Sequence, residues 1–292
     1  MPYRIAVFGA NGQLGSDLSR LIAARDDLEL IALSRPSVDA FDLASTRERL
    51  KDLSFDAAIN CVAATRVDDC ETDANSAVAI NAEFAALAAE LCAARDARLV
   101  QVSTDYVFGG QTERRPLDER VAIAPLNVYG ATKALGESLA AATNPETLVV
   151  RVAALFGVAG ASGKGGNFVE TMIRLGRERG AIRVVDDQHI SPTSTYDAAE
   201  AIVQLLRRRA PAGVYHVSNG GEATWFELAK ATIERLAIQA EVTPITSAEF
   251  PTPARRPPYS ILDSSKAATV IGRPLRHWRE ALDHYLVAKS YL

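Results

Sequence analysis

The chain has 292 residues, of which 48% are hydrophobic and 23% charged, and its formal net charge is -4. This length and apolar content suit one large α/β domain with a small lobe, and the mixed charges leave no basic surface for nucleic acid. No apolar run approaches the roughly 20 residues that cross a bilayer, and no signal sequence opens the chain. We therefore expect a cytoplasmic protein that binds neither nucleic acid nor a membrane.

Apolar strands alternate with helical patterns through the first half of the chain. We predict strands at 4–9, 28–33, 56–62, 98–103 and 148–152, and helices at 13–24, 74–94 and 129–142. This alternation predicts an α/β fold in which a doubly wound parallel sheet of the Rossmann type carries helices on both faces.

The second half begins with a stretch at 156–166 that is rich in Gly, Ala and Ser, for which we expect a mobile loop. We predict helices at 167–179, 194–208 and 224–236, the last opened by a Thr cap, and strands at 182–185 and 213–217. The prolines of 251–258 exclude regular helix, so this segment should be extended.

Glycines recur at every third residue between the first strand and the first helix, in Gly9-Ala10-Asn11-Gly12-Gln13-Leu14-Gly15. Such glycines allow a tight turn, close approach of a pyrophosphate and close packing of helix against strand. The helix N-terminus then offers free N–H groups to the phosphates. We predict a dinucleotide site formed by Gly9, Asn11, Gly12, Gln13, Leu14 and Gly15.

The end of the second strand bears on the choice of cofactor. Sites selective for NAD place an acidic residue about 20 residues beyond the glycines, whereas this chain has Ser34 and Arg35 there. Arg35 suits the 2'-phosphate of NADP(H), which we therefore favour while NAD(H) stays open. Asp42 and Leu43 fall where a loop would contact the adenine.

Tyr129 and Lys133 lie four residues apart and share one face of the predicted helix. A nearby ammonium lowers the pKa of a phenol towards the range in which general acid–base catalysis is efficient. Ser103-Thr104-Asp105 ends the fourth strand, where open parallel sheets bind ligands. We predict Thr104, Tyr129 and Lys133 as catalytic residues, with Ser103 in reserve for Thr104.

Together these residues resemble the extended short-chain dehydrogenase/reductase superfamily, and within it the dTDP-4-dehydrorhamnose reductase family. The resemblance spans almost the whole length and rests on motifs in both halves of the chain. They are Gln13-Leu14-Gly15, Val67-Asp68 with Glu71, Asn81-Ala82-Glu83, Ser103–Phe108, Asn127–Lys133, Gly166–Val169, Asp186–Gln188, Ser191–Thr193 and Ala254–Pro257.

The resemblance implies that NADPH reduces the C4 keto group of a nucleotide-linked 6-deoxy sugar, giving dTDP-L-rhamnose from dTDP-4-dehydro-L-rhamnose. Tyr129 would protonate the oxyanion, Lys133 would hold the nicotinamide ribose, and Thr104 would orient the keto oxygen. Ala63 and Ala64 are assigned to the cofactor. The substrate-side residues would be Val67, Thr104, Asp105, Asn167 and Arg256. We divide the chain into an NADP-binding Rossmann domain at 1–155, whose core continues beyond, and an interleaved, mainly substrate-binding lobe at 156–292.

Two departures from the family affect the expected sugar pocket. Ala154 stands where the family usually has a Trp, and Ala64 stands where it often has a Tyr. Asp17 falls near a position at which some members hold Mg²⁺ at a dimer contact, which is too little to predict a metal. The resemblance leaves a homodimer open.

Two other hypotheses remain beside the reductase. One is a different nucleotide-sugar reductase or an epimerase, because fold does not fix function. The other is a non-catalytic NADP-binding regulatory subunit, like the relative that regulates methionine adenosyltransferase. The presence of Tyr129, Lys133 and Thr104 favours an enzyme.

Overall fold

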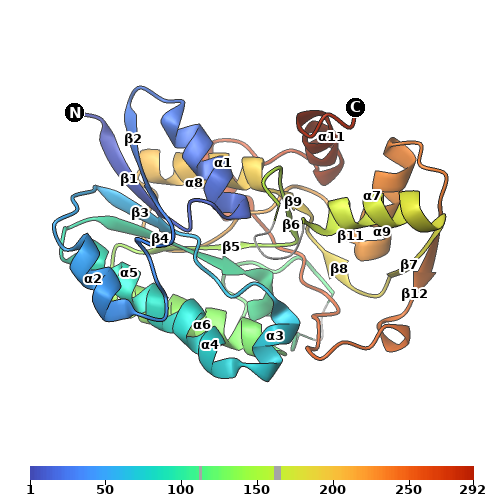
Figure 1. Cartoon of the computed structure of the whole chain (residues 1–292), viewed down its shortest axis with the longest axis horizontal. Helices are drawn as coiled ribbons and strands as arrows, with labels where there is room; N and C mark the ends of the chain where they lie inside the picture. The colour runs from blue at the N-terminus through green and yellow to red at the C-terminus, as the bar shows by residue number, and fades with distance from the viewer. Residues whose placement is uncertain (112–113, 161–165) are drawn as a thin grey trace.

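The computed structural model describes residues 1–111, 114–160 and 166–292. At the centre of these residues lies a six-stranded parallel sheet with the order β2-β1-β3-β4-β5-β10 (Figure 1). Its strands are β1 (Tyr3–Phe8), β2 (Leu28–Leu33), β3 (Ala57–Asn60), β4 (Arg98–Thr104), β5 (Leu148–Val152) and β10 (Gly213–His216). The order reverses between β1 and β3, which is where open α/β sheets bind their ligands.

Helices cover both faces of this sheet, as the alternation of strands and helices predicted (Figure 1). One face packs against α1 (Gln13–Ala23), α8 (Thr195–Arg207) and α10 (Ser265–Ile271), and the other against α2 (Leu43–Leu50), α5 (Phe84–Ala93) and α6 (Val128–Thr143). Alternate residues of β1 enter the two cores: Val7 packs with α1 and α8, whereas Phe8 packs with α5. This alternation is the two-residue period of a strand that is buried on both faces.

We expected no segment long and apolar enough to cross a membrane, but one helix meets this criterion. It runs from Ala74 to Ala93 through α4 (Ala74–Val78), the π-helical turn η1 (Ala79–Glu83) and α5, and its length and composition satisfy that test. It packs against β3, β4 and α6, and 56% of its most apolar window is buried. Such burial is typical of the core helix of a globular domain, so the helix is weak evidence for a membrane span.

The second half of the chain adds a smaller lobe beyond the carboxyl ends of the central strands (Figure 1). Its main elements are α7 (Phe168–Arg179), β7 (Ala181–Val185), α9 (Trp225–Arg235), β12 (Glu241–Ile245) and α11 (Trp278–Ala288). Two apolar clusters centred on α7 and α9 hold it together. The remaining short elements are β6 (Leu155–Phe156), β8 (His189–Ile190), β9 (Thr193–Ser194), β11 (Ala223–Thr224), α3 (Val67–Thr72), η2 (Asp105–Val107) and η3 (Ser247–Glu249).

The α/β Rossmann-type fold is confirmed, with most predicted ends within one or two residues of the observed ones. Thr224 caps α9 in a capping box, as predicted, and 251–258 forms neither helix nor strand. The strand expected at 56–62 ends early, at Asn60, because the chain turns there into a cavity. The prediction of a loop at 156–166 is wrong at its first residue, because Phe156 belongs to strand β6. Residues 161–165 lie outside the described part of the chain.

Candidate active site

A cavity of about 880 Å³ opens at the carboxyl ends of β1, β3, β4 and β5 and reaches α7 and α9 of the smaller lobe. Its volume lies at the upper end of the usual range for small-molecule sites, roughly 300–1,000 Å³. Most of the residues that the sequence singles out line it. These are Gly9, Asn11, Gly12, Gln13, Leu14, Gly15, Ser34, Arg35, Ala63, Val67, Thr104, Asp105, Tyr129, Lys133 and Asn167.

The glycine turn forms one wall and fits a diphosphate. Gly9 has a φ of +78°, which suits a residue without a Cβ, and its carbonyl oxygen accepts a hydrogen bond from the Gly12 N–H at 2.9 Å. Helix α1 begins without a side-chain cap and without an acidic residue in its first turn, so its N-terminal dipole is open to an anion. The Gln13 side-chain oxygen is buried against the cavity without a hydrogen-bond partner in the described part of the chain.

The end of β2 forms the far corner of the same cavity. Ser34 accepts a hydrogen bond from the Asn11 side chain at 3.1 Å, and the exposed Arg35 follows. The next loop brings in Asp39 and Phe41, which the sequence did not indicate; the Phe41 ring is 65% exposed. A cation, a carboxylate and an aromatic ring therefore surround the place where an adenosine would bind.

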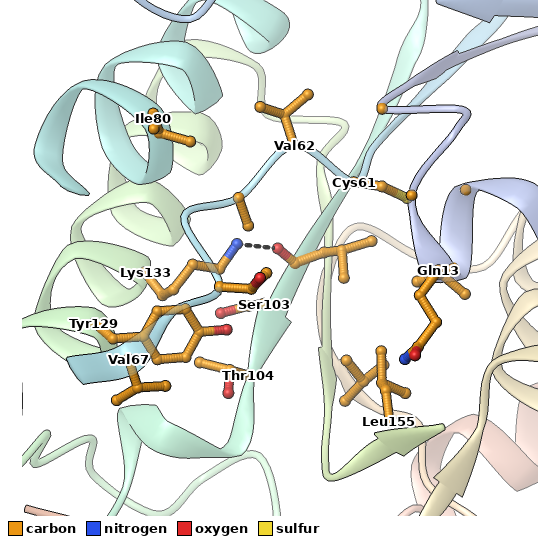
Figure 2. Close-up of a pocket in the computed structure, with 18 of the residues that line it drawn as sticks. Gln13, Cys61, Val62, Val67, Ile80, Ser103, Thr104, Tyr129, Lys133 and Leu155 are labelled. Atoms are coloured by element: carbon orange, nitrogen blue, oxygen red, sulfur yellow. Dashed lines mark hydrogen bonds between the residues drawn. The ribbon is translucent and has the colours of Figure 1, made fainter. Parts of the chain in front are cut away.

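The three residues predicted to be catalytic come together as a triplet from two elements that line the cavity. Thr104 ends β4, whereas Tyr129 and Lys133 stand in the first turns of α6, which Asn127 caps by accepting a hydrogen bond from Gly130 at 2.7 Å. The Lys133 Nζ donates to the Val102 carbonyl at 2.7 Å (Figure 2). Thr104, Tyr129 and Lys133 line the same cavity, and Tyr129 and Lys133 reach it from one side of α6, as their spacing predicted.

Burial controls the protonation of this pair. It raises the pKa of Tyr129, against a smaller opposing effect of a hydrogen bond with Thr104, and it lowers the pKa of Lys133 to about 8. The expectation that Lys133 lowers the pKa of Tyr129 is therefore not met in this structure. The buried phenol stays protonated at neutral pH, which suits a group that gives up a proton.

Asp105 is a second titratable group beside the triplet. It is fully buried, and burial raises the pKa of its carboxyl to about 6. The carboxylate accepts hydrogen bonds from the Thr104 hydroxyl at 3.0 Å and from the Ser260 hydroxyl at 2.6 Å. Ser260 belongs to the second half of the chain, so this carboxylate links the two halves at the cavity.

Four predicted site residues lie outside the lining of the cavity. Asp42 caps α2 by accepting a hydrogen bond from Ser45, Leu43 begins α2 and packs against the core, and the Ala64 N–H donates to Asn81. Arg256 forms a two-point ion pair with Asp68, at 2.6 and 2.7 Å.

Asn167 lines the cavity, but its side chain is engaged in the fold: it caps α7 and donates to Gly157 and Tyr285. Asp17 accepts hydrogen bonds from Arg20 and Thr195. Among the described residues, no group of three or more His, Cys, Asp or Glu side chains could hold a metal ion.

An aromatic wall on the smaller lobe was missed in the sequence. Phe168 begins α7 and Trp225 begins α9, their ring centres lie 4.6 Å apart, and both line the cavity. Nothing in the local sequence shows that two distant helix starts meet. Ala154 faces the same cavity with a φ of +40°, a left-handed conformation that side chains seldom adopt.

Comparison with known proteins points in the same direction as this geometry. The family model described as the RmlD substrate binding domain matches residues 3–290. A dTDP-4-dehydrorhamnose reductase of Streptomyces griseus is 41% identical over 96% of this chain and 91% of its own length. A dTDP-4-keto-6-deoxy-D-glucose reductase of Streptomyces niveus is 37% identical over 97% of this chain and 96% of its own.

A solved structure carries the likeness into three dimensions. The dTDP-4-dehydrorhamnose reductase of Bacillus anthracis, in complex with NADP, superposes with a TM-score of 0.91 at 34% identity. The match covers 99% of this chain and 100% of that one, so it includes both the sheet and the smaller lobe.

Proposed function

This chain belongs to the RmlD substrate-binding domain family, and on that premise we propose that it reduces dTDP-4-dehydro-L-rhamnose to dTDP-L-rhamnose with NADPH. The observation that carries the proposal is the convergence of Thr104, Tyr129 and Lys133 on one cavity with the glycine turn. The reaction is thus the transfer of a hydride and a proton to the C4 keto group of a nucleotide-linked 6-deoxy sugar.

The cofactor would lie along the carboxyl ends of β1 to β4. The backbone of the Gly9–Gly15 turn and the start of α1 would hold the pyrophosphate, and Arg35 would face the 2'-phosphate. Ala63 and Lys133 would line the nicotinamide half. When bound there, NADPH supplies the hydride.

The proton comes from the chain itself. Tyr129 is protonated at neutral pH because burial raises its pKa, so its hydroxyl gives a proton to the oxygen at C4 as negative charge develops there. The Lys133 ammonium, which donates to the Val102 carbonyl in the free chain, would turn to the ribose hydroxyls of the bound cofactor and hold the nicotinamide beside Tyr129. The Thr104 hydroxyl, next to Tyr129, orients the keto oxygen.

The substrate side would be formed by residues of both halves of the chain. We assign Val67, Asp105 and Asn167 to contacts with the sugar. Arg256, which pairs with Asp68, would shape the substrate side of the cavity. Residues 156–292 would mainly supply the smaller lobe, with α8 and β10 in the central fold. A cytoplasmic location, a homodimer and the adenine contacts of Asp42, Leu43 and Ala64 belong to the same proposal.

The test is NADPH oxidation with enzymatically generated dTDP-4-dehydro-L-rhamnose, with the Tyr129→Phe variant as the control. Turnover by the native chain that is lost in the variant would support the reductase. A native chain that binds NADPH without turnover of this sugar would contradict the proposed reaction, whereas an active variant would contradict only the role of Tyr129.

A second candidate is a reductase of a different dTDP-linked 4-keto sugar. Ala154 and Ala64 are small residues, and Ala154 lines the cavity. The relative from Streptomyces niveus is named as acting on dTDP-4-keto-6-deoxy-D-glucose at nearly the same identity as the rhamnose reductases. Parallel assays of the two keto sugars distinguish the candidates by their kcat/KM.

A further inference from the structure

A row of polar residues crosses the central sheet directly behind the catalytic residues. Ser103, Arg151 and His216 are register partners on β4, β5 and β10, so their side chains leave the same face of the sheet. All three are buried. Helix α6, which carries Tyr129 and Lys133, covers this face and places Glu137 against the row.

Both carboxylate oxygens of Glu137 accept hydrogen bonds from residues of this row. Its two carboxylate oxygens accept hydrogen bonds from Arg151 at 2.9 and 2.7 Å, and one of them also accepts a hydrogen bond from Ser103. Both side chains of the Arg151–Glu137 pair are less than a tenth exposed. A buried ion pair of this kind is costly to separate, because either charge left alone is desolvated.

Arg151 is itself fixed on two further sides. Its guanidinium lies 3.4 Å from His216 Nε2 and 5.1 Å from the centre of the Phe108 ring. His216 Nδ1 lies 2.9 Å from the Leu117 carbonyl, so the neutral ring donates there and accepts from Arg151. Burial and the Arg151 charge hold the pKa of His216 at about 4, so His216 is neutral at neutral pH and does not compete as a cation for Glu137.

The Arg151–Glu137 ion pair affects which partner Lys133 can have. Lys133 precedes Glu137 by four residues on α6, the spacing at which a lysine and a glutamate ordinarily pair. In the described part of the chain, however, the Lys133 ammonium donates to the Val102 carbonyl, while Glu137 is occupied by Arg151. The ammonium therefore faces the cavity without a paired carboxylate.

We propose that Arg151, by holding Glu137, keeps Lys133 out of an ion pair and so sets the charge with which Lys133 meets the cofactor. Arg151 and Glu137 are thus positioning residues that act through Lys133. This inference rests on the proposed function only in that the cavity takes NADPH. It predicts how the charge of Lys133 responds when either partner is removed.

Several titratable groups face Lys133. Tyr129 and Glu137 lie on its own helix, Cys61 follows β3, and Asp105 follows β4, with Arg151 and His216 behind Glu137. Burial lowers the pKa of Lys133 to about 8, and Glu137 and Cys61 oppose that effect. Burial raises the pKa of Cys61 to about 12, so that thiol stays neutral and Lys133 is the group that titrates in the weakly alkaline range.

The two single substitutions should move this titration in opposite directions. In Arg151→Met the freed carboxylate of Glu137 pairs with Lys133 and favours its charged form, which raises its pKa. In Glu137→Gln the uncompensated guanidinium of Arg151 repels the ammonium and lowers that pKa. The double variant carries neither charge and should lie between the two.

The experiment is the dissociation constant of NADPH, measured by fluorescence in the full chain from about pH 6 to about pH 10, a range that spans the lysine titration. The native chain should lose affinity near the pKa of Lys133, and the midpoint of that loss should rise in Arg151→Met and fall in Glu137→Gln, each by about one pH unit. Arg207→Met, which removes an exposed ion pair with Asp27, should leave the midpoint unchanged.

The outcomes separate this inference from the proposed reaction. Midpoints that move the same way, or that do not move, overturn it, because a structural role of the pair would weaken binding at every pH. If Arg151→Met does not fold, the inference is still tested by two midpoints. The midpoint should fall in Glu137→Gln and return towards the native value in the double variant. No sugar is present, so failure to reduce the keto sugar leaves this result intact, whereas a native chain without NADPH affinity overturns both.

Discussion

The carbonyl oxygen of Gly9 lies 2.1 Å from the point at which a Cβ atom would stand at Gly15. No heavy atom tolerates that distance, so the start of α1 packs against the end of β1 only because position 15 has no side chain. The third glycine of the turn is thus a requirement of helix–strand packing, and the N–H groups that face the cavity depend on it.

Gly15→Ala should therefore disrupt both packing and cofactor binding. We expect the free energy of unfolding to fall by about 1–3 kcal/mol, as for other overpacked sites, and NADPH affinity to fall at least about tenfold. Denaturant titration and fluorescence titration measure the two effects. Gly180→Ala is the matched control, because a Cβ there meets nothing within 4 Å and only its φ of +66° is unfavourable; equal NADPH affinity in Gly15→Ala and Gly180→Ala would refute the argument.

Tyr129→Phe should remove the proton donor and little else. We expect kcat to fall by about 10²–10⁴-fold, the usual contribution of a positioned general acid, while the dissociation constant of NADPH stays within a few fold. Steady-state NADPH oxidation and equilibrium binding test the two halves separately. A variant that retains turnover would exclude Tyr129 as the acid and direct attention to Asp105.

Arg35→Ala should discriminate between the two nicotinamide cofactors. Loss of a charge-assisted contact to the 2'-phosphate should weaken NADPH binding by about 1.5–3 kcal/mol, and NADH binding should not change. Arg174→Ala, which breaks an exposed ion pair with Glu178, serves as the control. Equal losses for both cofactors would mean that Arg35 acts on the shape of the loop and not on the phosphate.

Asp105 should make stability depend on pH in a defined direction. Its folded pKa, about 6, lies above its ordinary value of 3.8, so the folded chain binds more protons than the unfolded chain between these values. Ionised Asp105 therefore costs stability above pH 6, and the cost disappears as the pH falls towards 4. Relative to Asp105→Asn, the native free energy of unfolding should rise by up to about 3 kcal/mol from pH 7 to pH 4. Urea titrations of both chains across this range measure this difference. A difference that stays constant with pH would mean that Asp105 has the same pKa in the folded and the unfolded chain.

Ala154→Trp should report on the sugar. A ring at this position adds apolar surface to the cavity that Phe168 and Trp225 also line, and should lower KM for dTDP-4-dehydro-L-rhamnose by about 5–30-fold, equivalent to about 1–2 kcal/mol. The same steady-state assay shows the alternative plainly. A large rise in KM would mean that the native substrate already fills this space, in favour of a different dTDP-linked keto sugar.

The sequence was informative where function depends on short-range pattern. The glycine turn and the Tyr129–Lys133 spacing each lie within one strand–turn–helix or one helix, so their geometry follows from local periodicity. The parallel sheet followed from the alternation of strands and helices. Helix α2 was missed because its apolar stripe is weak: only Thr46 and Leu50 of its residues are buried.

The remaining site residues depend on contacts between distant segments. The pairing of Phe168 with Trp225 requires two helix starts separated by more than fifty positions to meet, and no local pattern encodes it. The effect of burial on Tyr129 was missed for the same reason. The Tyr–Lys spacing indicates a nearby ammonium, whereas the degree of desolvation depends on the whole cavity.

The last strand of the central sheet, β10, follows α7 and β7 of the smaller lobe along the chain. β10, at 213–216, hydrogen-bonds along β5, and α8 fills the groove beside α1. A gene cut after residue 155 would thus leave β5 as an unprotected edge, a template for aggregation. The smaller lobe is therefore not a separable unit that could be exchanged whole between related chains. If specificity changes in such a chain, we expect the changes to be point substitutions along the cavity, which Ala154 lines, with the order of the strands kept.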